Sequence, residues 1–168
     1  MDLPTLLSLI TTLSIVAAGI FAGVQLRQIN KQRTRESALQ MLHAAQTPEF
    51  MEGVNIVFNL PENLTKEQIE EFAGDKMICL LVLFGTFESL GILVHRHEIK
   101  LELIDDFFSG PVILFWKKLR NYFLEIRQSS SRDNYGEWVQ WLAERLEERE
   151  KKTGLLPAHI QYKTWKEK

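Results

Sequence analysis

The sequence predicts an all-α protein in which a single N-terminal transmembrane helix continues into a cytosolic helical bundle. Residues 3–26 carry no charged side chain, and this stretch is long enough to cross a bilayer as a helix. Over most of the remaining chain, apolar residues recur at spacings of three and four, the period of an amphipathic helix. No stretch alternates apolar and polar residues in the manner of a half-buried strand.

The predicted transmembrane anchor comprises residues 1–26. About 20 helical residues span the hydrocarbon core of a bilayer, and Leu3 to Leu26 supply 24 residues without a charge. The leading Met1-Asp2 carries no lysine or arginine, and the apolar run is longer than that of a cleavable signal peptide. We therefore expect a retained anchor, and the alternative interpretation is a buried helix of a soluble protein.

The charges that follow the anchor predict its orientation. Basic residues flank the cytoplasmic side of a membrane helix, and Glu36 is the first acidic residue after the anchor. We expect a location in the bacterial inner (cytoplasmic) membrane, with the N-terminus outside and the C-terminal domain in the cytoplasm. The same basic residues are predicted to form a collar that contacts anionic lipid head groups. This collar consists of Arg27, Lys31, Arg33 and Arg35.

Small and hydroxyl-bearing residues share one face of the anchor. Gly19 and Gly23 form a G-x-x-x-G pair, and small residues allow two helix backbones to approach closely. Ser8 and Thr12 continue this face, and their hydroxyl groups can form hydrogen bonds across a helix contact. The four residues predict packing of the membrane helix against further copies of itself, and in a pore they would line the passage.

Beyond the anchor, the sequence predicts three further regions. Residues 27–46 form a basic juxtamembrane helix that continues from the anchor, so that one helix of about 60 Å extends over about residues 4–45. Residues 47–154 form the cytosolic helical bundle, and residues 155–168 form a C-terminal tail. The apolar and aromatic residues of the tail predict that it packs on a neighbour.

Two helix start signals define the first part of the bundle. Thr47 as N-cap and Pro48 at the first helical position begin a helix that ends near Asn59. Thr65 and Gln68 match the capping box of a short helix that ends near residue 72.

The most apolar segment of the chain extends from Met77 to Val94. Its 18 residues carry one charge, on Glu88, and match either the central helix of a bundle or a second membrane span. We favour the central helix because of this charge, the glycines at 85 and 91, and the charged residues close to both ends. A second span would carry the amphipathic helices that follow to the outside of the membrane.

Two longer helices complete the predicted bundle. The first covers about residues 100–128, with a kink or break at Gly110-Pro111 because proline lacks the backbone donor. The second takes Asp133 or Asn134 as its N-cap.

The composition argues against several classes of function. A net charge of −2, with its positive part concentrated in the collar, gives no basis for DNA binding. The single cysteine, Cys79, cannot form an intramolecular disulfide and fits a reducing compartment. His95 and His97 point to different faces of a helix, and no other residues with metal-ligand spacing accompany them. We therefore predict no metal, no cofactor and no catalytic residue.

The carboxylate of Glu88 needs a partner within its apolar helix, because burial of an unpaired charge is costly. We predict a buried ion pair with Arg96, Arg120 or Arg127. A functional pocket at this position is the alternative interpretation.

Scattered apolar and aromatic positions resemble a known family. They are Phe87-Glu88-x-Leu90-Gly91-x-Leu93-Val94, Glu98-Ile99, Trp116, Arg127 and Trp138-x-x-Trp141-Leu142-Ala143-Glu144-Arg145. Over roughly residues 5–146, the chain resembles small bacterial membrane proteins of the DUF4760 type, which carry a domain of unknown function. The resemblance implies one N-terminal membrane helix followed by a helical cytosolic domain, and it implies no particular reaction.

The layout is also similar to the single-pass membrane accessory protein of RNA-targeting CRISPR systems of the Cas13b type. That resemblance implies a membrane pore around a divergent HEPN-like helical domain. An active HEPN ribonuclease has an arginine followed four to six residues later by a histidine, whereas Arg35 and His43 lie too far apart. The nearest analogue, Lys152 and His159, has lysine in place of the arginine.

Together, these observations predict a non-enzymatic protein that self-assembles at the membrane. We expect it to act as a membrane effector or pore, or as a scaffold, in phage defence, with membrane lipid and further copies of the chain as partners. The alternatives are a divergent HEPN-like ribonuclease and an accessory subunit of a larger membrane or defence complex.

Overall fold

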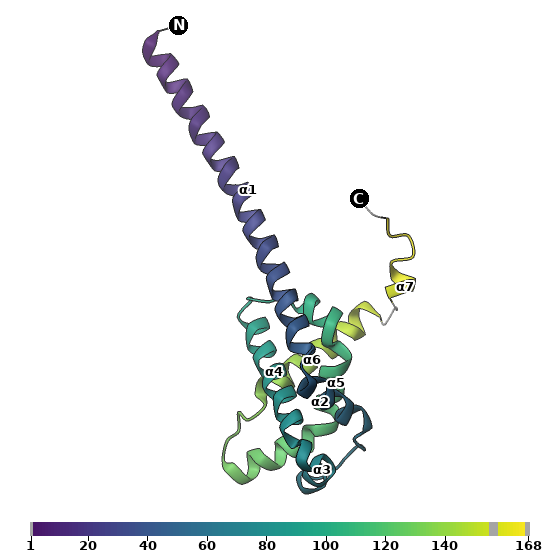
Figure 1. Cartoon of the computed structure of the whole chain (residues 1–168). Coiled ribbons are helices and arrows are strands. Elements are labelled where there is room, and N and C mark those ends of the chain that lie inside the picture. Colours follow the sequence, from purple (N-terminus) through teal and green to yellow (C-terminus); the bar gives the residue numbers. More distant parts are fainter. Residues whose placement is uncertain (1, 155–157, 167–168) are drawn as a thin grey trace. The chain divides into compact units, whose positions relative to one another are not determined.

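The computed structural model describes residues 2–154 and 158–166 (Figure 1). Within these ranges, side chains are described except at positions 3, 5–12, 30–31, 33–35, 37–38, 40–42, 44 and 161. Every regular element in the described ranges is a helix, which confirms the all-α prediction. The elements are α1 (Leu3–Ala45), α2 (Pro48–Asn59), α3 (Lys66–Ala73), the 3-10 helix η1 (Gly74–Lys76), α4 (Met77–His95), α5 (Leu101–Ser130), α6 (Glu137–Thr153) and α7 (Ala158–Gln161).

The chain divides into two compact units, Met1–His43 and Ala44–Lys168. Helix α1 accounts for the first unit and is one unbroken helix of 43 residues, as the sequence predicts for about residues 4–45. At 1.5 Å per residue, this helix is about 65 Å long. The remaining helices belong to the second unit.

Local capping explains where α2 and α3 begin. The Thr47 hydroxyl accepts a hydrogen bond from the Phe50 N–H at 3.3 Å, and a proline occupies the first position of α2. At the start of α3, the Thr65 hydroxyl accepts from the Gln68 N–H at 3.3 Å, and the Gln68 side chain accepts from the Thr65 N–H at 2.9 Å. This reciprocal pair satisfies two donors that the first turn leaves free, and it confirms the predicted capping box.

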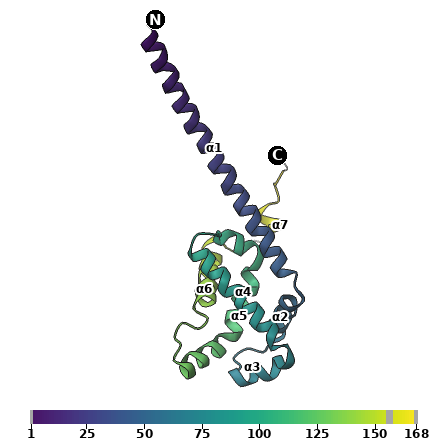
Figure 2. The ribbon, with the colours of Figure 1, turned by 60° about the vertical axis from the view of Figure 1, so that its left-hand side comes forward.

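The core of the second unit is built on α4, which contacts both α2 and α6 (Figures 1 and 2). Phe87 of α4 is fully buried. Its ring centroid lies 5.9 Å from that of Phe50 on α2 and 5.5 Å from that of Phe115 on α5. Both pairs are edge-to-face, which is a favoured arrangement of aromatic rings. A single side chain therefore ties three helices together.

Two glycines allow α4 to approach its neighbours at backbone distance. A Cβ atom added to Gly53 of α2 would lie 2.5 Å from the carbonyl oxygen of Cys79 on α4. A Cβ atom added to Gly91 of α4 would lie 2.5 Å from the carbonyl oxygen of Trp138 on α6. Both distances are far shorter than a carbon–oxygen contact, so each helix crossing depends on the absence of a side chain.

Helix α4 covers the most apolar part of the sequence and buries seven of its residues within the chain. Of the described residues, one helical stretch, Lys66–His95, is long and apolar enough to cross a membrane by length and composition. In its most apolar window, 39% is buried inside the chain, and the core helix of a soluble domain passes the same test. The packing against α2 and α6 is what we expect of a central helix, and the second membrane span remains the alternative.

Helix α5 covers the predicted region as one helix, and of the two predicted alternatives at Gly110-Pro111 a break is excluded. It continues from Leu101 to Ser130 with the proline inside it. Proline at position 111 removes only the donor for the carbonyl of residue 107, and burial of the flanking turns against the core outweighs that single loss. Phe108 and Val112 are both buried there.

Helix α6 differs from the prediction at its start. It begins at Glu137, and its N-cap is Gly136, which has a positive φ of 73° and no side chain to accept a hydrogen bond. The predicted caps, Asp133 and Asn134, lie earlier, in a turn where the Glu137 N–H donates to the Asn134 carbonyl at 3.2 Å. The prediction of a local cap is therefore wrong, and the first turn of α6 takes its acceptor from another helix.

Candidate functional site

The apolar surface of α1 is the first candidate site. Seven large apolar side chains between residues 13 and 26 are 47–67% exposed, because a lone helix cannot cover its own side chains. Removal of apolar surface from water contributes about 25 cal/mol per Å², and a surface of this length favours lipid or a partner helix over water. The residues are Leu13, Ile15, Val16, Ile20, Phe21, Val24 and Leu26.

Two of the four residues predicted to pack the membrane helix have open space around them. Cβ atoms added to Gly19 and Gly23 would meet nothing within 4 Å, in contrast to Gly53 and Gly91. Contacts within the described chain therefore do not require glycine at positions 19 and 23. Ser8 and Thr12 lie on the same helix, and their side chains are outside the description.

The predicted collar lies on the part of α1 that follows this apolar surface. Arg27 is exposed, whereas the side chains of Lys31, Arg33 and Arg35 are outside the description. In the same stretch, the Gln32 amide donates to the Glu36 carboxylate at 2.9 Å across one helical turn.

The second candidate site is the junction of α4, α5 and α6, where the structure places Glu88. Its carboxylate accepts a hydrogen bond from the backbone N–H of Val139 at 2.8 Å, and the Trp138 N–H also donates to it. These are donors of the first turn of α6, which Gly136 cannot satisfy. The Glu88 side chain thus takes the place of the capping side chain that Gly136 lacks, although it lies 51 residues before Val139 in the sequence.

Arg127 of α5 lies at the same junction but bonds to other partners. Its Nε donates to the Tyr135 carbonyl at 2.8 Å, and its Nη1 donates to the Gln140 amide oxygen at 2.9 Å. The guanidinium carbon lies 5.9 Å from the centroid of the Trp116 ring, which is within the range of a cation–π contact. Arg127 therefore fastens the loop before α6, and its Nη2 atom is buried without a hydrogen-bond partner in the described structure.

No ion pair within 4 Å joins Glu88 to Arg96, Arg120 or Arg127 in the described part of the chain. Arg127 still lowers the pKa of Glu88 through its charge, whereas Arg120 is exposed on α5. The structure thus brings Glu88 and Arg127 to one junction, where each holds backbone groups at the start of α6.

Burial changes the acid–base behaviour of this junction. Desolvation raises the pKa of Glu88 above its usual value, and the two backbone hydrogen bonds oppose that rise. Burial also raises the pKa of Tyr135, and the charge of Glu88 adds to this shift. Burial raises the pKa of Tyr122 to about 12. Both tyrosines line a small, open apolar recess formed by α4, α5 and the loop before α6.

The cap at Glu88 leads to a testable prediction. We expect Glu88→Ala to lower the free energy of unfolding by about 1–3 kcal/mol, because it leaves the N–H of the buried Val139 without its acceptor. Glu88→Gln is expected to cost less, since its amide oxygen can still accept this bond. Urea unfolding of the detergent-solubilised chain, followed by tryptophan fluorescence, measures both losses. Equal stability of all three proteins would contradict the capping role.

The raised pKa of Glu88 adds a pH dependence with a defined sign. Between the unfolded value of about 4.5 and the raised native value, the native state binds more protons than the unfolded state. The contribution of Glu88 to stability is therefore fully present below about pH 4.5 and is lost as the pH rises through the native pKa. Glu88→Gln is expected to flatten this part of the stability profile relative to the parent protein.

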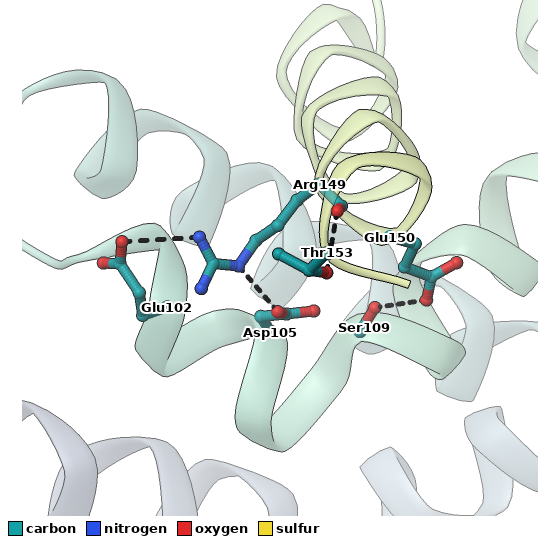
Figure 3. A network of polar contacts seen from close by, with 6 residues as sticks. All are labelled: Glu102, Asp105, Ser109, Arg149, Glu150 and Thr153. Atoms are coloured by element: carbon teal, nitrogen blue, oxygen red, sulfur yellow. Dashed lines mark hydrogen bonds and ion pairs between the residues drawn. The ribbon is translucent and has the colours of Figure 1, made fainter. Parts of the chain in front are cut away.

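A network of polar contacts joins the start of α5 to the end of α6 (Figure 3). The Arg149 Nε donates to Asp105 at 2.8 Å, and its Nη1 lies 3.4 Å from Glu102. Beside them, the Ser109 hydroxyl donates to Glu150 at 2.9 Å. Acidic residues near a helix N-terminus and a cation near a helix C-terminus both complement the helix dipoles, so this network stabilises the α5–α6 pair.

Histidines and other predicted reactive groups lie apart from these sites. His95 packs on two tryptophans, with ring centroids 4.8 Å from Trp138 and 5.7 Å from Trp141. No group of three or more histidine, cysteine, aspartate or glutamate side chains in the described chain could hold a metal ion. Lys152 and His159 are exposed on α6 and α7, and residues between them fall outside the description.

The sequence interpretation missed the cap at the start of α6. Two signals bear on it: a lone carboxylate in an apolar helix, and a glycine where a helix usually has a capping side chain. Neither signal identifies its counterpart, because the two positions are far apart in the chain.

The fold and the sites define an all-α protein with two parts. One part is a long helix with an exposed apolar surface. The other is a helical unit in which Glu88 of α4 caps the first turn of α6. The chain belongs to the DUF4760 family, described as a domain of unknown function, whose model matches residues 12–146. No curated protein and no solved structure matches the chain. The similarity to the Cas13b accessory protein therefore stays a prediction.

Proposed function

We propose that the protein is a single-pass protein of the bacterial inner membrane that self-assembles and acts non-enzymatically as a membrane effector or pore, or as a scaffold, in phage defence. The N-terminus lies outside, and the helical unit lies in the cytoplasm. The observation that carries this proposal is the exposed apolar surface of α1 between residues 13 and 26. Lipid is the environment that covers such a helix on all sides.

The orientation is supported by the order of residues along α1. The apolar surface is followed directly by the basic collar that begins at Arg27, and cytoplasmic flanks carry such an excess of positive charge. Helix α1 continues without interruption to Ala45, so the membrane segment and the start of the helical unit share one helix.

Self-assembly is supported by the G-x-x-x-G spacing of Gly19 and Gly23 on α1. Glycines cost helix stability relative to alanine, by roughly 0.5–1 kcal/mol each in water, and close helix–helix approach in a membrane compensates for such residues. Inside the helical unit, Gly53 and Gly91 meet backbone atoms whereas Gly85 meets nothing within 4 Å, so the open space at Gly19 and Gly23 leaves room for another helix, and their G-x-x-x-G spacing favours such a contact.

A scaffold or effector role is supported by the hydrogen bonds that polar side chains form between elements of the helical unit. Glu88, Arg127 and Arg149 each bond to groups that hold one helix to another. These contacts maintain the arrangement of α4, α5 and α6, and a protein that acts through assembly depends on such an arrangement.

The self-association of α1 provides the experiment. We expect Gly19→Leu combined with Gly23→Leu to raise the dissociation constant of the oligomer in proteoliposomes about tenfold, because leucine side chains hold the two backbones apart. Energy transfer between labelled copies measures this constant. Ala17→Leu is the matched control, since residue 17 lies on the opposite face of the helix.

Unchanged association of the double variant, or an equal loss in the Ala17→Leu control, would contradict assembly through this face. Ion conductance of the same proteoliposomes separates the two modes of action. A pore requires conductance that depends on the oligomer, whereas a scaffold requires the oligomer alone.

A further inference from the structure

The segment after α6 exposes large apolar side chains outside the predicted anchor. Ile160 is 51% exposed, Tyr162 is 57% exposed and Trp165 is 71% exposed. The sequence predicts that this tail packs on a neighbour, yet the described part of the chain covers none of these three side chains. A different surface is therefore needed to remove them from water.

The backbone of this segment is already wound and hydrogen-bonded. The Tyr162 N–H donates to the Ala158 carbonyl at 2.9 Å, and the Trp165 N–H donates to the Tyr162 carbonyl at 2.9 Å. Backbone groups that are paired locally lose less when a segment moves into a less polar environment. The segment is thus suited to an interface between water and an apolar phase.

The sequence around these side chains carries a net positive charge. Residues 151–168 contain five lysines and one glutamate, although the whole chain has a net charge of −2. Lys163 and Lys166 stand next to the exposed aromatic residues, and both are exposed. Tryptophan, tyrosine and lysine together are the residues found where proteins meet the head groups of a bilayer.

We propose that residues 158–166 dock on the anionic surface of the membrane, with Tyr162 and Trp165 at the level of the head groups and the lysines against lipid phosphates. The cytoplasmic leaflet carries the negative surface charge that this segment complements. The choice of that leaflet rests on the proposed orientation of the protein. Docking gives the helical unit a second contact with the bilayer besides α1.

Fluorescence of Trp165 in the full chain tests this proposal. The chain contains four tryptophans, so the signal of Trp165 is the difference between the parent protein and Trp165→Phe. The protein is reconstituted in phosphatidylcholine vesicles that contain phosphatidylglycerol, with brominated lipid as a quencher. We expect the Trp165 emission to be quenched and shifted to shorter wavelength in these vesicles.

The lysines provide the matched variants. Each lysine near an anionic surface contributes about a fivefold change in partitioning, so Lys163→Gln combined with Lys166→Gln is expected to abolish most of the quenching. Lys76→Gln combined with Lys100→Gln removes the same charge from the helical unit and is expected to leave the quenching unchanged. Salt at about 1 M, where the Debye length is about 3 Å, is expected to abolish most of the quenching, as the substitution of Lys163 and Lys166 does.

Three outcomes would overturn the proposal. The first is unquenched Trp165 emission in anionic vesicles, and the second is equal quenching in the parent protein and the Lys163→Gln, Lys166→Gln variant. The third is a concentration-dependent shift of Trp165 emission in detergent without lipid, which would assign the segment to a second copy of the chain. Failure of the anchor is detected separately, because alkaline extraction reports on α1 and the quenching reports on Trp165.

Discussion

Replacement of Gly91 by alanine is expected to lower the free energy of unfolding by about 3 kcal/mol. The added Cβ would lie 2.5 Å from the carbonyl oxygen of Trp138 and 3.0 Å from its Cβ. The nearest of these contacts are with the backbone of α6, so relief requires that the whole helix move away from α4. Such a movement also draws the first turn of α6 away from the Glu88 carboxylate that caps it.

The same helix supplies the control for this prediction. A Cβ atom added to Gly85 meets nothing within 4 Å, and alanine is the better helix former by roughly 0.5–1 kcal/mol. Gly85→Ala is therefore expected to stabilise α4 slightly. Urea unfolding of the parent and both variants measures the difference, and a Gly91→Ala protein as stable as Gly85→Ala would refute the close crossing of α4 and α6.

Two arginines in the apolar part of α1 are expected to release the protein from the membrane. Ile15→Arg combined with Ile20→Arg places two charges in the predicted span, and each arginine near the centre of a membrane helix costs about 3 kcal/mol. The sum of about 6 kcal/mol exceeds what most single-span helices can lose, so most of the variant should appear in the soluble fraction after alkaline extraction.

The matched control places arginines on the same helix outside the span. Ile29 and Leu39 are each 47% exposed, and Ile29→Arg combined with Leu39→Arg is expected to leave the protein in the membrane pellet. Release of the parent protein at alkaline pH would disprove the anchor. Retention of the Ile15→Arg, Ile20→Arg variant in the membrane pellet at the level of the parent would also disprove the anchor.

Features set by neighbouring residues could be predicted from the sequence. Helix α2 begins at Pro48 and ends at Asn59 as expected, because the cap at Thr47 and the proline act within one turn. The capping box of Thr65 and Gln68 is present for the same reason. The unbroken course of α1 follows from the absence of glycine and proline between residues 24 and 47.

Features set by contacts between distant residues could not be predicted in this way. The acceptor for the first turn of α6 is Glu88, and the sequence offers no means to pair it with Val139. The uninterrupted helix at Pro111 depends on burial of the turns around it, which outweighs one missing donor. Likewise, the sequence does not show that Gly53 and Gly91 lie at close helix crossings, because the backbone atoms that they approach belong to distant residues.

The candidate sites also differ in whether neighbouring residues or distant residues define them. The apolar surface and collar of α1 are properties of consecutive residues, and the sequence displays them directly. The sequence indicates that Glu88 needs a partner, but the identity of that partner depends on how α4 crosses α6. The proposed self-assembly involves further copies of the chain, and contacts with them cannot be derived from local patterns within one copy.

The place of Glu88 has a consequence for biosynthesis. The ribosome completes α4 before α6, and residues 96–136 separate the two helices. During that interval the apolar stretch Lys66–His95 lacks its cover from α6 and has the length and composition of a membrane span. A free carboxylate at position 88 makes entry into lipid costly for a nascent chain. The residue that caps α6 in the folded unit therefore also raises the cost of moving an unpacked α4 into lipid.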